Sequence, residues 1–182
     1  MKKIIFLLGF VLAGQLLMAQ PKPTDLDKSP MDISYYPANY PILKMRGQAN
    51  GEPLARIIYS RPQKKGRDIF GQEVKYGEVW RLGANEATEL ELFTNATIGG
   101  KSVPKGRYVL YCIPTETKWT IIVNKDNYSW GSFTYKSDKD VARIDVPVQK
   151  NDDITEALTM YFEKNNLIIL WNNIKVAVPV SF

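Results

Sequence analysis

The sequence predicts an all-β protein built as a single antiparallel β-sandwich, jelly-roll-like or Ig-like, with at most one short helix. Short runs rich in β-branched and aromatic residues recur along the chain. Turn residues such as Gly99-Gly100 and Pro104-Lys105-Gly106 separate these runs at intervals expected of a sandwich. No segment keeps an apolar period of about 3.6 residues, which an amphipathic helix would require.

The first three expected elements lie before the middle of the chain. Ser29–Pro41 holds three prolines and three tyrosines in no helical or strand period, so we expect an extended segment lying over the fold. Leu54–Ser60 is rich in β-forming residues and is predicted to be a strand. Thr88–Phe93 alternates polar and apolar residues, which indicates a half-buried strand.

A regular series of strands and turns follows. Ala96–Ile98 and Lys101–Val103 flank a Gly-Gly pair and are expected to form a hairpin. Arg107–Ile113 is a strongly apolar strand that Pro114 ends, because proline cannot donate to a strand ladder. A turn then leads into a further strand at Lys118–Asn124.

The last third of the chain predicts the remaining strands, for a total of nine or ten. Val141–Val148 alternates, and the polar residues Asn151-Asp152-Asp153 are interpreted as a turn after it. Ala157–Glu163 and Leu167–Trp171 are expected to pair as a hairpin. A final strand carries apolar residues at alternate positions within Ile174–Val180.

The N-terminus resembles a secretory signal peptide. A short positive start, Met1-Lys2-Lys3, precedes an apolar run at Ile4–Met18 and the small residue Ala19. We therefore expect a signal peptide at residues 1–19, a flexible lead-in at residues 20–28 and one sandwich domain at residues 29–182. The protein would be exported, to the periplasm or outside the cell. A membrane anchor is the alternative, but the run is shorter than the about 20 apolar residues of a span.

Composition excludes several kinds of site. Loss of Lys2 and Lys3 with the signal peptide lowers the formal net charge from +5 to +3, which is too small a surplus to indicate a nucleic-acid-binding protein. The chain has no histidine, so Ser-His-Asp triads and histidine-containing zinc sites are excluded. The one cysteine, Cys112, lies in an apolar run and is expected to be a buried small hydrophobe. We predict no metal site and no cofactor.

The candidate functional region is Arg61–Thr88, where unlike charged, amide and aromatic groups crowd together. In its basic loop, Gly66 allows backbone N–H groups to turn inward beside lysine and arginine side chains, which favours an anion pocket. A solvated hairpin tip is the alternative. In the following block, Arg81 can make two-point contacts, Asn85 can donate and accept, and Trp80 can form a stacking wall. The predicted ligand-binding residues are Lys65, Arg67, Asp68, Trp80, Arg81, Asn85, Glu86 and Thr88.

The same block has a purely structural interpretation. Arg81 and Glu86 could form a buried ion pair that fixes the loop to the sheet, with Asn85 satisfying a turn. Among the other tryptophans, Trp119 and Trp171 are expected in the core, and Trp130 is expected at the surface of a long loop.

Three motifs together resemble one protein family. The runs KGRDIFG at Lys65–Gly71, YGEVWRLGANEAT at Tyr76–Thr88 and IGGKSVPKGRYVLYCIP at Ile98–Pro114 are similar to the secreted bacterial family known as domain of unknown function 2911. The resemblance covers the chain from about Ser29 to its C-terminus. It implies an exported domain carrying the same blocks, and it implies no activity.

The sequence supports three hypotheses for function. The first is an exported domain that binds a small polar or anionic ligand, with saccharides among the candidates, at Lys65–Thr88. The second is a glycosidase-like hydrolase that uses Glu86 with Asp68 or Glu78, because two carboxylates can hydrolyse glycosides. The third is an envelope interaction module whose motif loop is structural. We expect no nucleic-acid partner and no stable membrane span after signal removal, and the sequence predicts no oligomeric state.

Overall fold

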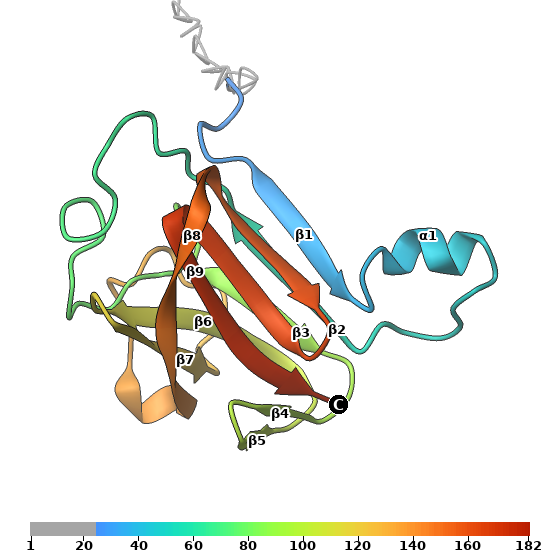
Figure 1. The fold of residues 1–182 in the computed structure, drawn as a ribbon. Helices are drawn as coiled ribbons and strands as arrows, with labels where there is room; N and C mark the ends of the chain where they lie inside the picture. Colours follow the sequence, from blue (N-terminus) through green and yellow to red (C-terminus); the bar gives the residue numbers. More distant parts are fainter. Residues whose placement is uncertain (1–24) are drawn as a thin grey trace, which may run out of the picture.

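The computed structural model describes residues 25–182 of the chain (Figure 1). The predicted signal peptide and residues 20–24 of the lead-in lie outside the described residues. Within residues 25–182, no helix is long and apolar enough to cross a membrane.

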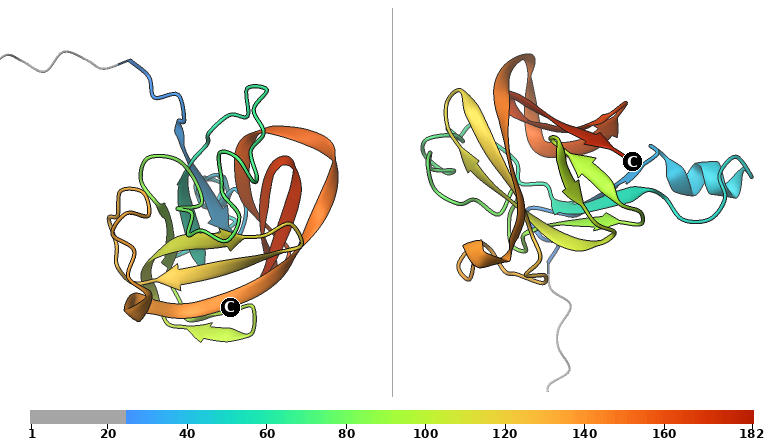
Figure 2. Two further views of the ribbon diagram at one scale, coloured as in Figure 1. Left: turned by 90° about the vertical axis from the view of Figure 1, so that its left-hand side faces the viewer. Right: turned by 90° about the horizontal axis from the view of Figure 1, so that it is seen from below.

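Within residues 25–182, nine strands form one antiparallel sheet in the order β1-β2-β3-β6-β7-β8-β9-β4-β5, which confirms the predicted all-β, antiparallel fold. One short α-helix, α1, lies beyond the end of β1 and to the side of the sheet (Figures 1 and 2). A single 3₁₀ turn precedes β8. The elements are β1 (Met31–Tyr36), α1 (Tyr40–Met45), β2 (Ala55–Ser60), β3 (Thr88–Leu92), β4 (Ala96–Ile98), β5 (Lys101–Val103), β6 (Gly106–Pro114), β7 (Lys118–Asn124), the 3₁₀ turn (Ser137–Lys139), β8 (Asp140–Glu163) and β9 (Asn166–Ser181).

The sheet curves strongly, so that distant strands share one core (Figure 2). Leu90 and Leu92 of β3 face Phe162 of β8 and Leu167 of β9 across a narrow apolar gap. Removal of such side chains from water is the main term that stabilises a fold of this kind. The predicted interior positions of Trp119 and Trp171 are confirmed, and Cys112 is fully buried as expected.

Strands β8 and β9 are longer than the sequence predicts. β8 pairs with β7 over its first residues and with β9 from Val148 onward, so it belongs to two ladders. The prediction of a turn at Asn151-Asp152-Asp153 is wrong, because these residues stay extended within β8. The polar run is instead a place where the β8–β9 register shifts, between Lys150 and Thr155. Such an irregularity lets a strand bend without ending it.

The segment Ser29–Pro41 contains a strand that the sequence did not predict. β1 pairs with β2 from Met31 opposite Ser60 to Tyr36 opposite Ala55. β1 is the edge of the sheet, and each of its residues is exposed or half-buried, with none fully buried. A strand without a fully buried face lacks the clean polar–apolar alternation by which strands are recognised.

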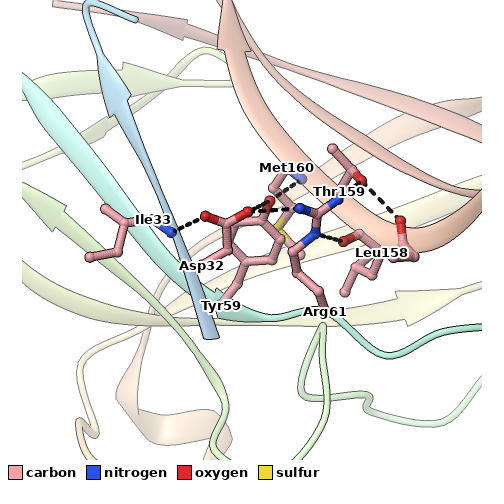
Figure 3. Close-up of polar contacts among 8 residues, drawn as sticks. Asp32, Ile33, Tyr59, Arg61, Leu158, Thr159 and Met160 are labelled. Carbon is pink, nitrogen blue, oxygen red and sulfur yellow. Dashed lines mark hydrogen bonds and ion pairs between the residues drawn. The ribbon is translucent and has the colours of Figure 1, made fainter. Parts of the chain in front are cut away.

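Arg61, directly after β2, ties the edge of the sheet to β8 (Figure 3). Its Nη1 lies 3.0 Å from Asp32 Oδ2, its Nε donates to the carbonyl of Leu158 at 3.1 Å, and its Nη2 donates to Thr159 Oγ1 at 2.9 Å. The Tyr59 hydroxyl accepts a hydrogen bond from the Met160 amide at 3.0 Å in the same cluster. One guanidinium therefore joins β1 and β8, which are far apart in sequence.

Candidate anion-binding site

The connection from β2 to β3 carries the candidate residues and lies at one end of the sheet (Figure 1). It begins by crossing to β8, where Lys64 N donates to Glu156 O at 2.8 Å and Leu158 N donates to Pro62 O at 3.0 Å. The basic run is therefore held against a strand and does not form an isolated hairpin tip.

The loop after Trp80 is fixed by hydrogen bonds at both ends. Trp80 exchanges two backbone hydrogen bonds with Cys112 of β6, at 2.7 and 2.8 Å. The buried Thr88 hydroxyl donates to Leu82 O at 2.7 Å, and Ser60 Oγ donates to Ala84 O at 2.6 Å. These contacts give the loop one conformation and leave the Thr88 hydroxyl occupied inside the protein.

Trp80 lies in an aromatic cluster beneath this loop. Only 8% of the residue is exposed, and its Nε1 donates to Gly83 O at 3.1 Å. Its ring stacks on Trp171 and meets Trp119 edge to face. The indole therefore serves mainly as core, although it also lines the pocket described next.

A pocket of about 190 Å³ opens above this cluster. Its lining combines two tryptophans, Trp80 and Trp171, with the charged residues Arg67, Glu73 and Arg81. Arg67 and Arg81 come from the predicted site, whereas Trp171 comes from β9 and Glu73 from the intervening loop. No sequence pattern links Glu73 or Trp171 to Arg81, because only the folding of the sheet brings them together.

Arg81 is half-buried, and its charge has no ion-pair partner among residues 25–182. Its Nε is shielded from solvent and has no hydrogen-bond partner among residues 25–182. Burial lowers the pKa of its guanidinium below the ordinary value, although the group remains cationic at neutral pH. A buried Nε–H without an acceptor is unfavourable, so Arg81 is the residue of this lining whose polar groups are least satisfied.

The ion pair between Arg81 and Glu86, offered above as a structural alternative, is not present in residues 25–182. Glu86 is exposed and makes a backbone bridge with Trp130, whose side chain is 60% exposed, as predicted. Asn85 adopts a left-handed backbone conformation and donates from Nδ2 to Asp27 Oδ2 at 3.0 Å. Asn85 therefore does form a turn, as the structural interpretation expected.

Arg67 is held by its own loop. Its Nη1 lies 2.9 Å from Glu73 Oε2, and its Nε and Nη2 donate to the carbonyls of Lys64 and Gln63. Glu73 thus neutralises Arg67, which leaves the Arg81 charge uncompensated in the pocket. The Lys65 amide donates to Glu156 Oε1. Lys65 itself is exposed and does not line the pocket.

The three carboxylates of the hydrolase hypothesis lie in different surroundings. Asp68 lines a separate hollow beside Asn172. Glu78 lies next to Lys75, at 3.9 Å, in a shallow depression that Arg81 also borders. Glu86 lines neither of these. Within residues 25–182, no group of three or more Cys, Asp or Glu side chains is placed to hold a metal ion.

Comparison with known proteins gives one family match. The family model described as "Protein of unknown function (DUF2911)" matches residues 43–180. The matched region includes Arg67, Glu73, Trp80, Arg81 and Trp171 of the pocket lining, whereas Ser29, which also lines the pocket, lies outside it. No curated protein and no solved structure matches the chain.

Proposed function

The chain belongs to the DUF2911 family of proteins of unknown function, as its motifs indicated, and we propose that this member binds a small anion in the Arg81 pocket. The observation that carries the proposal is Arg81, a residue of the pocket lining whose guanidinium has no ion-pair partner within residues 25–182 and whose Nε is buried there without an acceptor.

The energetics favour an anionic ligand. A buried donor without an acceptor costs about 1–3 kcal/mol, and more if it is charged. A carboxylate or phosphate oxygen placed in the pocket would neutralise the guanidinium. It would accept from the buried Nε–H only after a movement of the Arg81 side chain. Arg67 cannot supply such an acceptor, and Glu73 is already 2.9 Å from Arg67.

The pocket also restricts the size and shape of the anion. A volume of about 190 Å³ is smaller than the about 300–1,000 Å³ of pockets for drug-sized ligands, so the ligand would be small. Apolar surface from Trp80 and Trp171 lies beside the charge, so the ligand would carry a carbon skeleton next to its anionic group. Small organic acids, including acidic sugars, meet both conditions.

Export is part of the proposal. The signal-peptide-like start at residues 1–19 supports a function in the periplasm or outside the cell. There the pocket would meet small anions from the surroundings of the cell.

Thermal unfolding in the presence of anions tests this function. Acetate, glucuronate, phosphate and sulfate would each be compared with sodium chloride at equal ionic strength, for the wild type, Arg81→Gln and Arg46→Gln. Arg46 is an exposed arginine at the end of α1, so its variant loses the same charge outside the pocket. A ligand at a hundred times its Kd adds about 2.7 kcal/mol of stability. This corresponds to a rise in Tm of roughly 5–10 °C for a chain of this size.

We expect at least one anion to raise the Tm of the wild type and of Arg46→Gln, and to have little effect on Arg81→Gln. Equal shifts in all three proteins would reflect general salt stabilisation and would overturn the proposal. The absence of any shift beyond that of chloride would overturn it as well.

A further inference from the structure

A second hollow lies beside the loop that carries Arg67 and Glu73. It has a volume of about 310 Å³ and is bordered by that loop and by β9. Its polar lining consists of Asp68, Gln72, Tyr76, Asn172 and Asn173. It shares none of these residues with the Arg81 pocket, so it requires its own explanation.

The two asparagines reach this hollow through an irregularity in β9. In a regular strand, neighbouring side chains point to opposite faces. Asn172 has a φ of 55°, in the left-handed region, and its pairing with Thr155 lies between two register shifts of the β8–β9 ladder. This break in the alternation allows the consecutive residues Asn172 and Asn173 to line one hollow. Bulges of this kind are common next to binding sites, where they redirect side chains.

Tyr76 also lines the hollow, and its ring packs against Gly71. A Cβ built on Gly71 would lie 3.2 Å from Tyr76 Cε2, so the ring packs directly over the glycine backbone. Gly71 has a φ of 91°, which disfavours any other residue there. The turn beneath it is closed by hydrogen bonds from Gly71 N to Val74 O and from Val74 N to Ile69 O, both 2.8 Å. The tyrosine is 39% exposed, so part of its surface is open to a ligand while the ring also packs on Gly71.

The polar groups around the hollow are free to bind a ligand. The side chains of Asp68, Asn172 and Asn173 make no hydrogen bond or ion pair with another residue of the described part of the chain. An asparagine amide both donates and accepts, and an ionised carboxylate accepts from two donors. None of the residues that line the hollow is basic.

We propose that this hollow binds a neutral saccharide. A sugar ring presents hydroxyl groups that donate and accept around its edge, and these suit two amides and a carboxylate. Its C–H faces are apolar and suit the exposed Tyr76 ring. The absence of a basic lining residue distinguishes this site from the Arg81 pocket and disfavours an anionic ligand. The proposal goes beyond the anion-binding function and stands without it.

Titration with neutral oligosaccharides tests the proposal. Cellotriose, maltotriose, xylotriose and chitotriose would be added to the ¹⁵N-labelled protein while the side-chain amide signals of asparagine are followed by NMR. We expect at least one trisaccharide to shift the Asn172 and Asn173 amide signals, with a Kd at or below about 1 mM. Glycerol at the same hydroxyl concentration is the control for a general effect of hydroxyl groups.

Matched variants locate the binding. Tyr76→Ala and Asn173→Ala should each weaken it by about three- to tenfold or more, which corresponds to one lost contact. Tyr128→Ala and Asn50→Ala remove an exposed tyrosine and an exposed asparagine elsewhere, and should leave the Kd unchanged. Arg81→Gln should also leave it unchanged, so this test can succeed or fail independently of the anion pocket.

Three results would overturn the proposal. One is that no trisaccharide shifts the two amide signals more than glycerol does. Another is that the Tyr76 and Asn173 variants, shown to be folded by circular dichroism, bind as tightly as the wild type. A third is that the Tyr128 and Asn50 variants weaken binding equally, which would place the sugar elsewhere.

Discussion

The rings of Trp80 and Trp171 stack with their centroids 5.8 Å apart and their planes only 20° from parallel. Trp80 belongs to the loop block that the sequence marks as functional, and Trp171 belongs to β9. The stack therefore joins the candidate site to the last strand of the sheet. It also explains why Trp80 packs as a core residue although it lines a pocket.

Replacement of Trp80 by alanine should destabilise the protein by about 3–5 kcal/mol, because a large buried ring would leave a cavity among Phe70, Trp119 and Trp171. Trp130→Ala is the matched control, and we expect a change within about 0.5 kcal/mol because its side chain is mostly exposed. Urea unfolding followed by circular dichroism measures both. Similar losses for the two variants would contradict the core role of Trp80.

In the absence of anions, Arg81→Met should be as stable as the wild type to within about 1 kcal/mol, or more stable. The substitution removes a desolvated donor without an acceptor and keeps the apolar stem. Glu86→Ala should change the free energy of unfolding by less than about 0.5 kcal/mol, since the side chain is exposed. Losses of about 3–5 kcal/mol in both variants would instead indicate a buried ion pair.

Arg61→Ala should lower the free energy of unfolding by more than the loss of an ordinary surface ion pair does. Besides its contact with Asp32, the guanidinium donates to Leu158 O and Thr159 Oγ1, so we expect a loss of about 1–3 kcal/mol (Figure 3). Lys118→Ala removes a more exposed pair with Asp145 and should cost less than about 1 kcal/mol. If urea unfolding gave the same loss of stability for Arg61→Ala and Lys118→Ala, the Arg61 cluster would not stabilise the contact between β1 and β8.

Gly99→Ala should be much more damaging than Gly100→Ala. Both glycines have positive φ, so each alanine carries a backbone cost of about 1 kcal/mol. At Gly99 the added Cβ would also overlap Ile144 Cγ2, which adds about 1–3 kcal/mol for overpacking, whereas Gly100 faces open space. Thermal unfolding of the two variants measures the difference. Indistinguishable Tm values would refute the close approach of the β4–β5 turn to β8.

At alkaline pH the free energy of unfolding should fall, in part because of the Tyr135 phenol. Burial, followed by its hydrogen bond to Asp140, raises the pKa of this phenol to about 12 from an ordinary value near 10. The unfolded chain then loses this proton at lower pH than the native protein, so the free energy of unfolding falls as pH rises from about 10 to 12. Tyr135→Phe should reduce this fall, as measured by urea unfolding between pH 9 and 11.5. An unchanged slope would contradict the shifted pKa.

Strand positions could be predicted where the pattern is local. β2, β3, β6 and β7 lie within a residue or two of the expected segments, and the β4–β5 hairpin agrees with its Gly-Gly turn. β1 was missed because an edge strand need not bury either face fully. The joining of the last predicted strands into β8 and β9 depends on bulges, which the pairing partner stabilises and the local sequence does not specify.

The site could be predicted only in part, for a related reason. Unlike functional groups clustered in sequence at Arg61–Thr88, and this indicated Arg67, Trp80 and Arg81, which share one pocket. Asp68 lines the other hollow, while Lys65, Asn85, Glu86 and Thr88 line neither. Trp171, Asn172 and Asn173 were missed because β9 reaches this region only through the curvature of the sheet. Their proximity is a tertiary property, with no counterpart in spacing along the chain.

The position of the β4–β5 hairpin has a consequence for the order of folding. Thr97 and Ile98 of β4 pair with Ser181 and Val180 of β9, more than eighty residues later in the chain. The hairpin can form early because its two strands are joined by a short turn. It cannot pair with the rest of the sheet until β9 is in place. Loop closure over such a separation is slow. We therefore expect a late kinetic phase in refolding. In this phase β9 would pair with the β4–β5 hairpin, which forms earlier.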